Sequence, residues 1–167
     1  DTRVHIVTPP LVNKYPTPQA KAKAKPEELM RLIQSTGFFR NKAKSILGFC
    51  QGIVARHGGK VPQTMEELIK LPGIGRKSAN AILGYAFGVP GIVVDTHMIR
   101  LSNRMGFTKH KDPVKIEHDL MTLIPKKEWT KFSSCMVWHG RRCCVARKPL
   151  CSKCPIGHLC PSYGIGI

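Results

Sequence analysis

Apolar residues recur along the chain at the three- and four-residue spacing that is typical of amphipathic helices. Ile46, Phe49, Cys50, Ile53 and Val54 follow this spacing, and their run closes at Gly58-Gly59. Only residues 91–94, GIVV, look like a strand, and four residues do not make a sheet. We therefore predict an all-α fold with short loops and helices within residues 26–37, 46–58, 64–71, 77–88, 95–106, 112–125 and 126–140.

Residues that favour helix ends support this interpretation. Pro26 stands at a first-turn position and is followed by two acids, while Thr64 and Glu67 have the spacing of a capping box. Asp95 or Thr96 is expected to cap the helix that begins there. By contrast, residues 1–25 are rich in Pro and Lys and poor in periodicity, so the prolines are expected to break regular elements there.

Charge narrows the class of partner. The chain has 27 Lys and Arg against 10 Asp and Glu, a net charge of +17. Such a basic protein usually binds a polyanion, and nucleic acid is the leading candidate, although a merely basic soluble surface is the alternative. No apolar run approaches the roughly 18 residues that span a membrane, and no signal peptide is recognised, so we expect a cytoplasmic protein and no membrane partner.

Two motifs carry candidate chemistry. In LPGIGRKSAN, Pro72 ends one predicted helix, and Gly73 and Gly75 permit positive φ before the next helix begins near Arg76. Backbone N–H groups at that helix start would bind a DNA phosphate, although an ordinary tight turn is the alternative. The second motif is a cysteine cluster whose close spacing predicts one metal centre: Cys144, Cys151, Cys154 and Cys160, in the pattern C-x6-C-x2-C-x5-C.

Zinc usually uses paired CxxC motifs, and the four-cysteine cluster contains only one such motif, so its spacing favours another metal centre. The remaining three cysteines are interpreted differently. Cys143 would change the first spacing to x7, so we expect it to be free. Cys50 and Cys135 lie in apolar helical patterns and are expected in the core.

The segments LPGIGRKSANAIL, VDTHMIRLSNR and HGRRCCVARKPLCSKCPIGHLC together resemble the endonuclease III family of pyrimidine glycosylases and abasic-site lyases. The resemblance implies two helical lobes: a helix-hairpin-helix barrel domain over 1–90 and an iron–sulfur domain over 91–167. The DNA cleft is expected between them, faced by Lys77 and Asp95. It also implies a [4Fe–4S] cluster on the four cysteines, which folds the VARKPL loop so that Arg147 and Lys148 contact phosphates.

The resemblance assigns Lys77 as the catalytic nucleophile and Asp95 as the essential carboxylate. A primary amine can attack C1′, expel the base and form a Schiff base, whereas a guanidinium cannot, so Arg76 is left to contact the backbone with Gly73 and Gly75. Burial and the helix N-terminus are expected to disfavour the ammonium form of Lys77. Asp95 would stabilise positive charge on the sugar, and its alternative role is the helix cap; the neighbouring His97 is interpreted as structural.

The implied function is base excision repair of double-stranded DNA that contains damaged pyrimidines or abasic sites, by a monomer associated with the bacterial nucleoid. In the family, one or two helices and a glutamine that fills the space of the flipped base precede the segment where this sequence begins. We expect that part of the fold to be missing, either because these 167 residues are a fragment, which we favour, or because the protein is truncated. Two alternatives are an adenine-mismatch glycosylase of the same superfamily, which lacks the lysine, and a non-catalytic iron–sulfur DNA-binding module.

Overall fold

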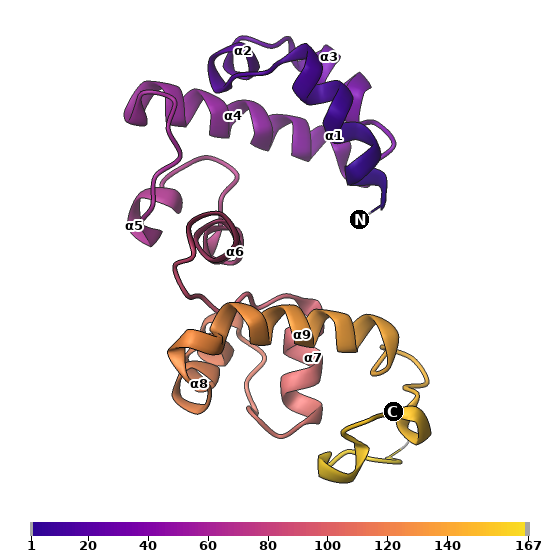
Figure 1. Ribbon diagram of the computed structural model, residues 1–167. Coiled ribbons are helices and arrows are strands. Elements are labelled where there is room, and N and C mark those ends of the chain that lie inside the picture. Colours follow the sequence, from indigo (N-terminus) through magenta and orange to yellow (C-terminus); the bar gives the residue numbers. More distant parts are fainter. Residues whose placement is uncertain (1, 166–167) are drawn as a thin grey trace. The chain divides into compact units, whose positions relative to one another are not determined.

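The computed structural model describes residues 2–165, and within this range it contains helices and loops but no strand (Figure 1). The all-α prediction is therefore confirmed. The α-helices are α1 (Thr2–Lys14), α2 (Pro18–Ala22), α3 (Pro26–Ile33), α4 (Phe39–His57), α5 (Met65–Leu68), α6 (Arg76–Phe87), α7 (Thr96–Arg104), α8 (Pro113–Leu123) and α9 (Trp129–Arg142). Short 3₁₀ turns are η1 (Lys126–Glu128), η2 (Cys151–Lys153) and η3 (Gly157–Leu159).

The chain divides into two compact units, residues 1–79 and 80–167, and the division falls inside helix α6. Each unit has its own cluster of buried apolar side chains. The boundary between the helix-hairpin-helix domain and the iron–sulfur domain, expected at residue 90, stays a prediction.

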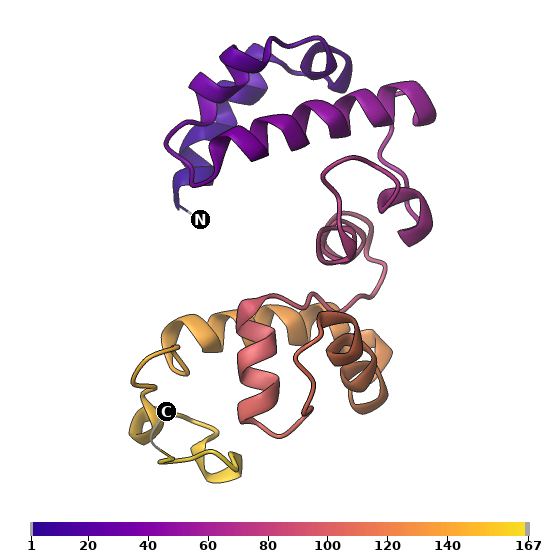
Figure 2. The ribbon, with the colours of Figure 1, turned by 180° about the vertical axis from the view of Figure 1, so that it is seen from behind.

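In the first unit, the long helix α4 packs against α2 and α3, and α3 packs against α1 (Figure 2). One cluster of buried side chains there consists of Val7, Leu11, Ala24, Leu29, Ile33 and Ala43. Leu29 is fully buried and Ile33 is 3% exposed, so the four-residue spacing of the sequence produces one continuous apolar stripe on α3. Helix α4 ends where Gly58 adopts φ 58, the left-handed conformation that glycine tolerates best.

The expectation for residues 1–25 is wrong, because α1 and α2 both form there. Helix α1 contains Pro9 and Pro10 in its interior, where each proline removes one backbone donor. Val7 and Leu11 lie one turn apart and are nearly buried against the cluster of the first unit. We attribute the helix to this packing, which local sequence rules do not include.

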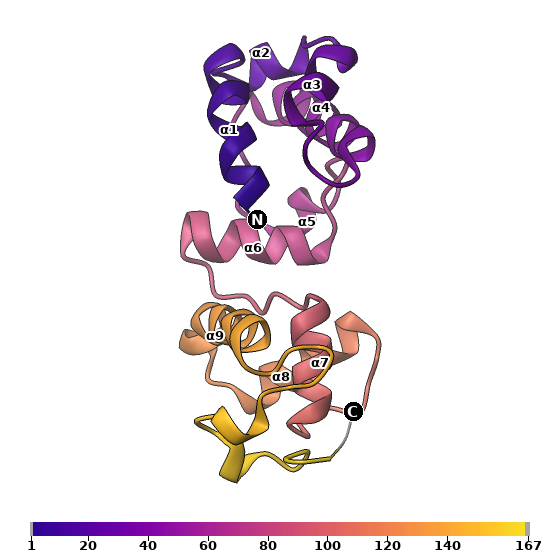
Figure 3. The same ribbon diagram turned by 90° about the vertical axis from the view of Figure 1, so that its right-hand side faces the viewer.

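In the second unit, helices α7, α8 and α9 surround a core that also receives the extended segment 91–94 (Figure 3). The backbone of this segment is held by side chains: Asn80 Nδ2 donates to the Ile92 carbonyl at 2.9 Å, and the Val93 N–H donates to Ser133 Oγ at 3.0 Å. These bonds replace the neighbouring strand that the segment lacks. Segment 91–94 therefore leads directly into the start of α7 at a fixed position. The core side chains are Ile92, Val94, Met98, Leu101, Ile116, Leu120 and Met136.

Membrane insertion by a helix is not a feature of the described part of the chain. None of the helices within residues 2–165 combines the length and the apolar character that crossing a bilayer requires.

Candidate active site and metal centre

The hairpin between α5 and α6 is fixed by the backbone of one glycine. Gly73 has φ 79, and a Cβ atom added there would lie 2.6 Å from Cβ of Ser45 on helix α4. Positive φ and close approach both require glycine at this position. Gly75 differs, because it does not belong to the described glycines with positive φ and a Cβ there would meet open space. Of the two hairpin glycines, Gly73 is therefore the one whose backbone conformation requires glycine.

Helix α6 begins directly after this hairpin. The Ala79 N–H donates to the Gly75 carbonyl at 3.0 Å, which closes the first helical turn over Arg76, Lys77 and Ser78. The first N–H groups of a helix have no acceptor within the helix, and the helix dipole adds partial positive charge there. Lys77 is exposed, so the expectation that it is buried is wrong. Its amine is accessible at a rigid helix start, next to a half-buried Arg76.

Asp95 caps helix α7. Its backbone is extended, its Oδ1 accepts a hydrogen bond from the Met98 N–H at 2.8 Å, and its Oδ2 lies 2.9 Å from Nδ1 of His97. The carboxylate is only 15% exposed. The predicted cap is thus present, and His97 is its neighbour. Both contacts hold the carboxylate in one orientation, which is what a catalytic carboxylate also requires.

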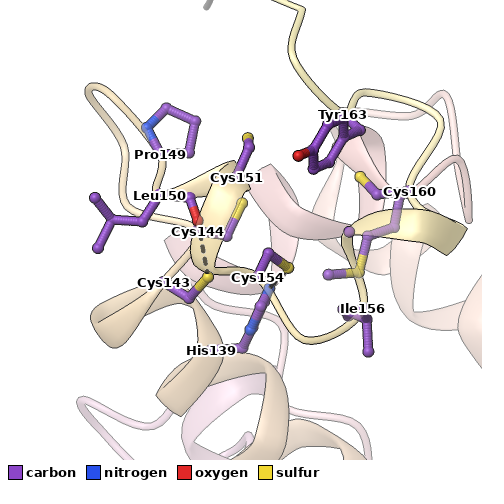
Figure 4. A pocket seen from close by; sticks show the side chains of 12 residues that line it. His139, Cys143, Cys144, Pro149, Leu150, Cys151, Cys154, Ile156, Cys160 and Tyr163 are labelled. Atoms are coloured by element: carbon purple, nitrogen blue, oxygen red, sulfur yellow. Dashed lines mark hydrogen bonds between the residues drawn. The ribbon is translucent and has the colours of Figure 1, made fainter.

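The cysteine cluster follows helix α9 and forms one pocket (Figure 4). The pocket is lined by the four cysteines of the motif, by the neighbouring Cys143 and by His139. Turns η2 and η3 bring the cysteines together, since each turn starts or ends beside one of them. The cysteines that line it, Cys143, Cys144, Cys151, Cys154 and Cys160, are all free thiols of intermediate burial.

Two arginines of helix α7 hold the first part of this loop. Arg104 donates from Nη1 to Cys144 Sγ at 3.3 Å and to the Val145 carbonyl at 2.8 Å, and from Nη2 to the Ala146 carbonyl at 3.0 Å. Arg100 donates from Nη2 to the Cys144 carbonyl at 3.0 Å. The loop is therefore anchored to a helix of the core by charged donors, which form stronger hydrogen bonds than neutral ones.

The last part of the loop returns to the same arginine. The backbone carbonyl of Arg104 accepts a hydrogen bond from Ser162 Oγ at 2.7 Å, and Cys160 Sγ lies 3.9 Å from it. Residue 104 thus contacts both ends of the cysteine motif, through its side chain and through its backbone.

The donor set fits an iron–sulfur cluster. Four thiols facing one pocket are the usual ligands of such clusters, and an N–H donor to a ligand sulfur stabilises its negative charge. Desolvation, followed by a hydrogen bond with Cys154 and by the charges of the neighbouring thiols, raises the pKa of the Cys143 thiol to about 11. Burial lowers the pKa of His139.

The two other cysteines have different positions. Cys50 is 4% exposed and lies in the core as predicted. Cys135 is exposed, so its predicted burial is wrong. Its neighbour Met136 is the residue of that turn that enters the core, which leaves Cys135 on the outer face of α9.

The two loop cations that are predicted to contact phosphates are accessible to solvent. Arg147 and Lys148 are both exposed, and Lys148 has φ 53, a conformation that is unusual for a residue with a side chain. Sequence reasoning missed one further residue, Phe38, which is 85% exposed with φ 56 at the start of α4. Strained backbone conformations cluster at functional sites, which makes Phe38 a candidate contact residue. The only signal in the sequence is the pair Phe38-Phe39 after Gly37.

Comparison with known proteins agrees with this geometry. Residues 1–126 match the model of the HhH-GPD superfamily base excision DNA repair proteins, and residues 144–160 match the iron–sulfur binding domain of endonuclease III. The endonuclease III of Synechocystis sp. is 55% identical over 163 residues, which are 97% of this chain and 74% of the relative. That of Bacillus subtilis is 43% identical over 161 residues, 96% and 74% of the two chains.

A solved structure of a trapped endonuclease III–DNA covalent intermediate is also similar, with a TM-score of 0.92 and 43% identity. The match covers 98% of this chain and 77% of that one. The fold and the site thus define a base excision repair protein of the helix-hairpin-helix class. The chain belongs to the endonuclease III family. It is an enzyme, a DNA glycosylase with abasic-site lyase activity, and its cofactor is a [4Fe–4S] cluster.

Proposed function

We propose that this enzyme removes oxidised pyrimidines from double-stranded DNA, with Lys77 as the nucleophile. The observation that carries the proposal is the position of Lys77, an exposed primary amine in the first turn of α6, directly after a hairpin whose backbone is fixed by Gly73. A lysine held on a rigid helix start can be presented to a nucleotide that has left the base stack.

The chemistry of the amine accounts for both activities. The unprotonated Nζ of Lys77 attacks C1′, the bond from C1′ to the base breaks, and the base leaves with the bonding electron pair and takes up a proton. After attack the nitrogen loses one proton, and its lone pair then forms the C=N bond while the bond from C1′ to O4′ breaks. O4′ takes up a proton as the sugar ring opens, which leaves a protonated Schiff base on Lys77. Removal of a C2′ proton then expels the 3′ phosphate by β-elimination, and water releases the lysine.

Asp95 is proposed to act on the charge that develops at the sugar. Its carboxylate is oriented by the Met98 N–H and by His97, so it needs no reorganisation during the reaction. Preorganised charges of this kind lower the barrier most when the transition state carries more charge than the ground state. The cap and the catalytic role are compatible, because the cap is what fixes the carboxylate.

Phosphate contacts are proposed at two places. The first is the hairpin, with the backbone of Gly73 and Gly75 and the side chain of Arg76. The second is the loop with Arg147 and Lys148, whose exposed cations neutralise phosphates. We further propose that the exposed ring of Phe38 inserts beside a base step, as apolar side chains of DNA-bending proteins do.

The [4Fe–4S] cluster is proposed to be held by Cys144, Cys151, Cys154 and Cys160. The matched iron–sulfur domain covers 144–160 and so begins and ends at two of these cysteines. When bound, the cluster would join the four cysteine thiolates through its irons and so fix the loop. We infer that the enzyme acts as a monomer at the nucleoid in the cytoplasm, where its substrate DNA is located.

A substrate panel tests the proposed specificity. Duplexes that carry one oxidised pyrimidine, one abasic site or one mismatched adenine are incubated with the enzyme, and strand cleavage and borohydride-trapped adducts are measured. We expect cleavage and trapping with the first two substrates and neither with adenine. Adenine excision without any trapped adduct would contradict the proposal.

A further inference from the structure

Three potential metal ligands gather at one side of the cysteine pocket. The Sγ atoms of Cys143 and Cys154 and one ring nitrogen of His139 all lie within 4.8 Å of one another. His139 Nε2 is 3.8 Å from Cys154 Sγ. Figure 4 shows the three side chains together at the end of α9. Cys143 directly follows the last residue of α9, and its N–H donates to the His139 carbonyl at 2.9 Å, so the end of the helix holds the two residues close together.

The spacing of these atoms fits one metal ion better than a cluster. In a tetrahedral zinc site with bonds of about 2.3 Å to sulfur and about 2.1 Å to nitrogen, the ligand atoms lie roughly 3.5 Å apart. In a [4Fe–4S] cluster each cysteine binds a different iron, so the ligand sulfurs are held farther apart. Two thiolates and one imidazole are also a common ligand set for zinc.

We propose that His139, Cys143 and Cys154 form a mononuclear site for a divalent zinc ion, with the fourth position open to water. Binding releases the protons of both thiols, and neutral His139 contributes a nitrogen lone pair. The Cys143 thiol donates to the Leu150 carbonyl at 3.6 Å, and this hydrogen bond is lost when the thiol releases its proton to bind zinc. Zinc binding at this site is separate from the repair activity, because it does not involve DNA.

The consequence is a competition between two metals. Cys154 is also a proposed ligand of the [4Fe–4S] cluster, so one thiolate is shared and the two sites cannot be filled together. Zinc would bind the cluster-free protein and block insertion of the cluster until it dissociates. Cys143 is the residue that makes this possible, since it is outside the four-cysteine motif.

Titration of the cluster-free full chain with Co²⁺ alone, and then with Zn²⁺ alone, tests the site. The variants are Cys143→Ser, Cys151→Ser and the matched control Cys135→Ser, which removes an exposed cysteine of helix α9 outside the ligand group. We expect the wild type and Cys135→Ser to bind one Co²⁺ with the spectrum of two thiolates. Cys143→Ser should bind Zn²⁺ about 10-fold more weakly or worse, because one ligand is lost.

Cys151→Ser separates this site from the cluster. It should keep the zinc site and lose the cluster, whereas Cys143→Ser should lose the zinc site and keep the iron of the cluster-loaded protein. Loss of zinc binding in Cys151→Ser, with normal binding in Cys143→Ser, would mean that the ion uses the four-cysteine set and would overturn the proposal. A full complement of iron in Cys151→Ser would instead contradict the proposed cluster ligands.

A second measurement does not depend on the folding of cluster-free protein. The full chain is produced in cells with increasing zinc, and iron and zinc per chain are measured after purification. We expect zinc to replace iron in the wild type and in Cys135→Ser, and iron to be retained in Cys143→Ser. Equal loss of iron in all three proteins would refute the competition.

Discussion

The Asp95 carboxylate accepts a hydrogen bond from the Met98 N–H at 2.8 Å, so the proposed catalytic carboxylate is also the cap of helix α7. This relationship makes the two roles separable by one substitution. Asn has nearly the same shape as Asp and also caps helices well, but it carries no charge.

Asp95→Asn is therefore expected to fold almost normally and to turn over slowly. The loss of stability should stay below about 1 kcal/mol, because the cap bond is retained. Single-turnover base release should fall by roughly 10²-fold or more with DNA affinity kept, as for other preorganised electrostatic groups. Thermal unfolding and quenched-flow cleavage of one lesion duplex measure both. Near-normal cleavage would leave Asp95 with the cap alone.

Lys77→Gln removes the nucleophile and keeps a polar side chain of similar length. Because Lys77 is exposed, the change should not affect folding. The variant should bind abasic DNA and yield no borohydride-trapped adduct. Lys60→Gln, another exposed lysine of the same unit, is the control and should trap normally. Trapping by Lys77→Gln at the normal rate would assign the nucleophile to another amine.

Arg104→Met tests whether helix α7 holds the cluster loop. The substitution keeps an apolar stem and removes the donors to Cys144 Sγ and to two carbonyls of the loop. Purified wild type should contain about four irons per chain. The variant should contain less iron and lose its visible absorbance faster in air, because the sulfur and the loop backbone lose charged donors.

Arg147→Met is the matched control for this loss, since that arginine is exposed in the same loop. It should retain iron like the wild type. Equal retention by all three proteins would show that the loop does not depend on Arg104.

The double variant Arg147→Gln/Lys148→Gln tests the phosphate contacts of the loop. Each phosphate contact releases counterions when DNA binds, so a variant with fewer contacts releases fewer of them. The slope of log affinity against log salt should therefore become shallower, by an amount that corresponds to up to about two contacts. Lys109→Gln/Lys111→Gln also removes two exposed cations of the second unit and serves as the control for net charge. A slope unchanged from the wild type would place the loop away from DNA.

Gly73→Ala and Gly75→Ala form a matched pair in the hairpin. At Gly73, positive φ costs about 1–2 kcal/mol for a residue with Cβ, and contact with Ser45 adds to this cost. At Gly75 the added Cβ meets open space, so the change should stay within about 0.5 kcal/mol. Urea unfolding of both variants measures the difference, and equal midpoints would mean that the hairpin is not fixed by Gly73.

Much of this protein was predictable from the sequence, because the determining interactions are local. Helix ends depend on residues three or four positions apart, so the amino-acid pattern alone marks Thr64, Asp95 and Gly58 as helix ends. The cysteine motif is equally local: its four thiols lie within 17 residues, and the matched domain 144–160 coincides with it.

Only the tertiary structure decided the features that depend on distant parts of the chain. Helix α1 forms despite Pro9 and Pro10 because Val7 and Leu11 pack into a core supplied by later helices. Arg104 contacts the cysteine loop some 40 residues away in sequence, and the grouping of Cys143 with His139 and Cys154 depends on how that loop folds back onto α9. The reason is physical: burial and charged hydrogen bonds act between residues that meet in space, and a linear pattern records periodicity but not which surfaces meet.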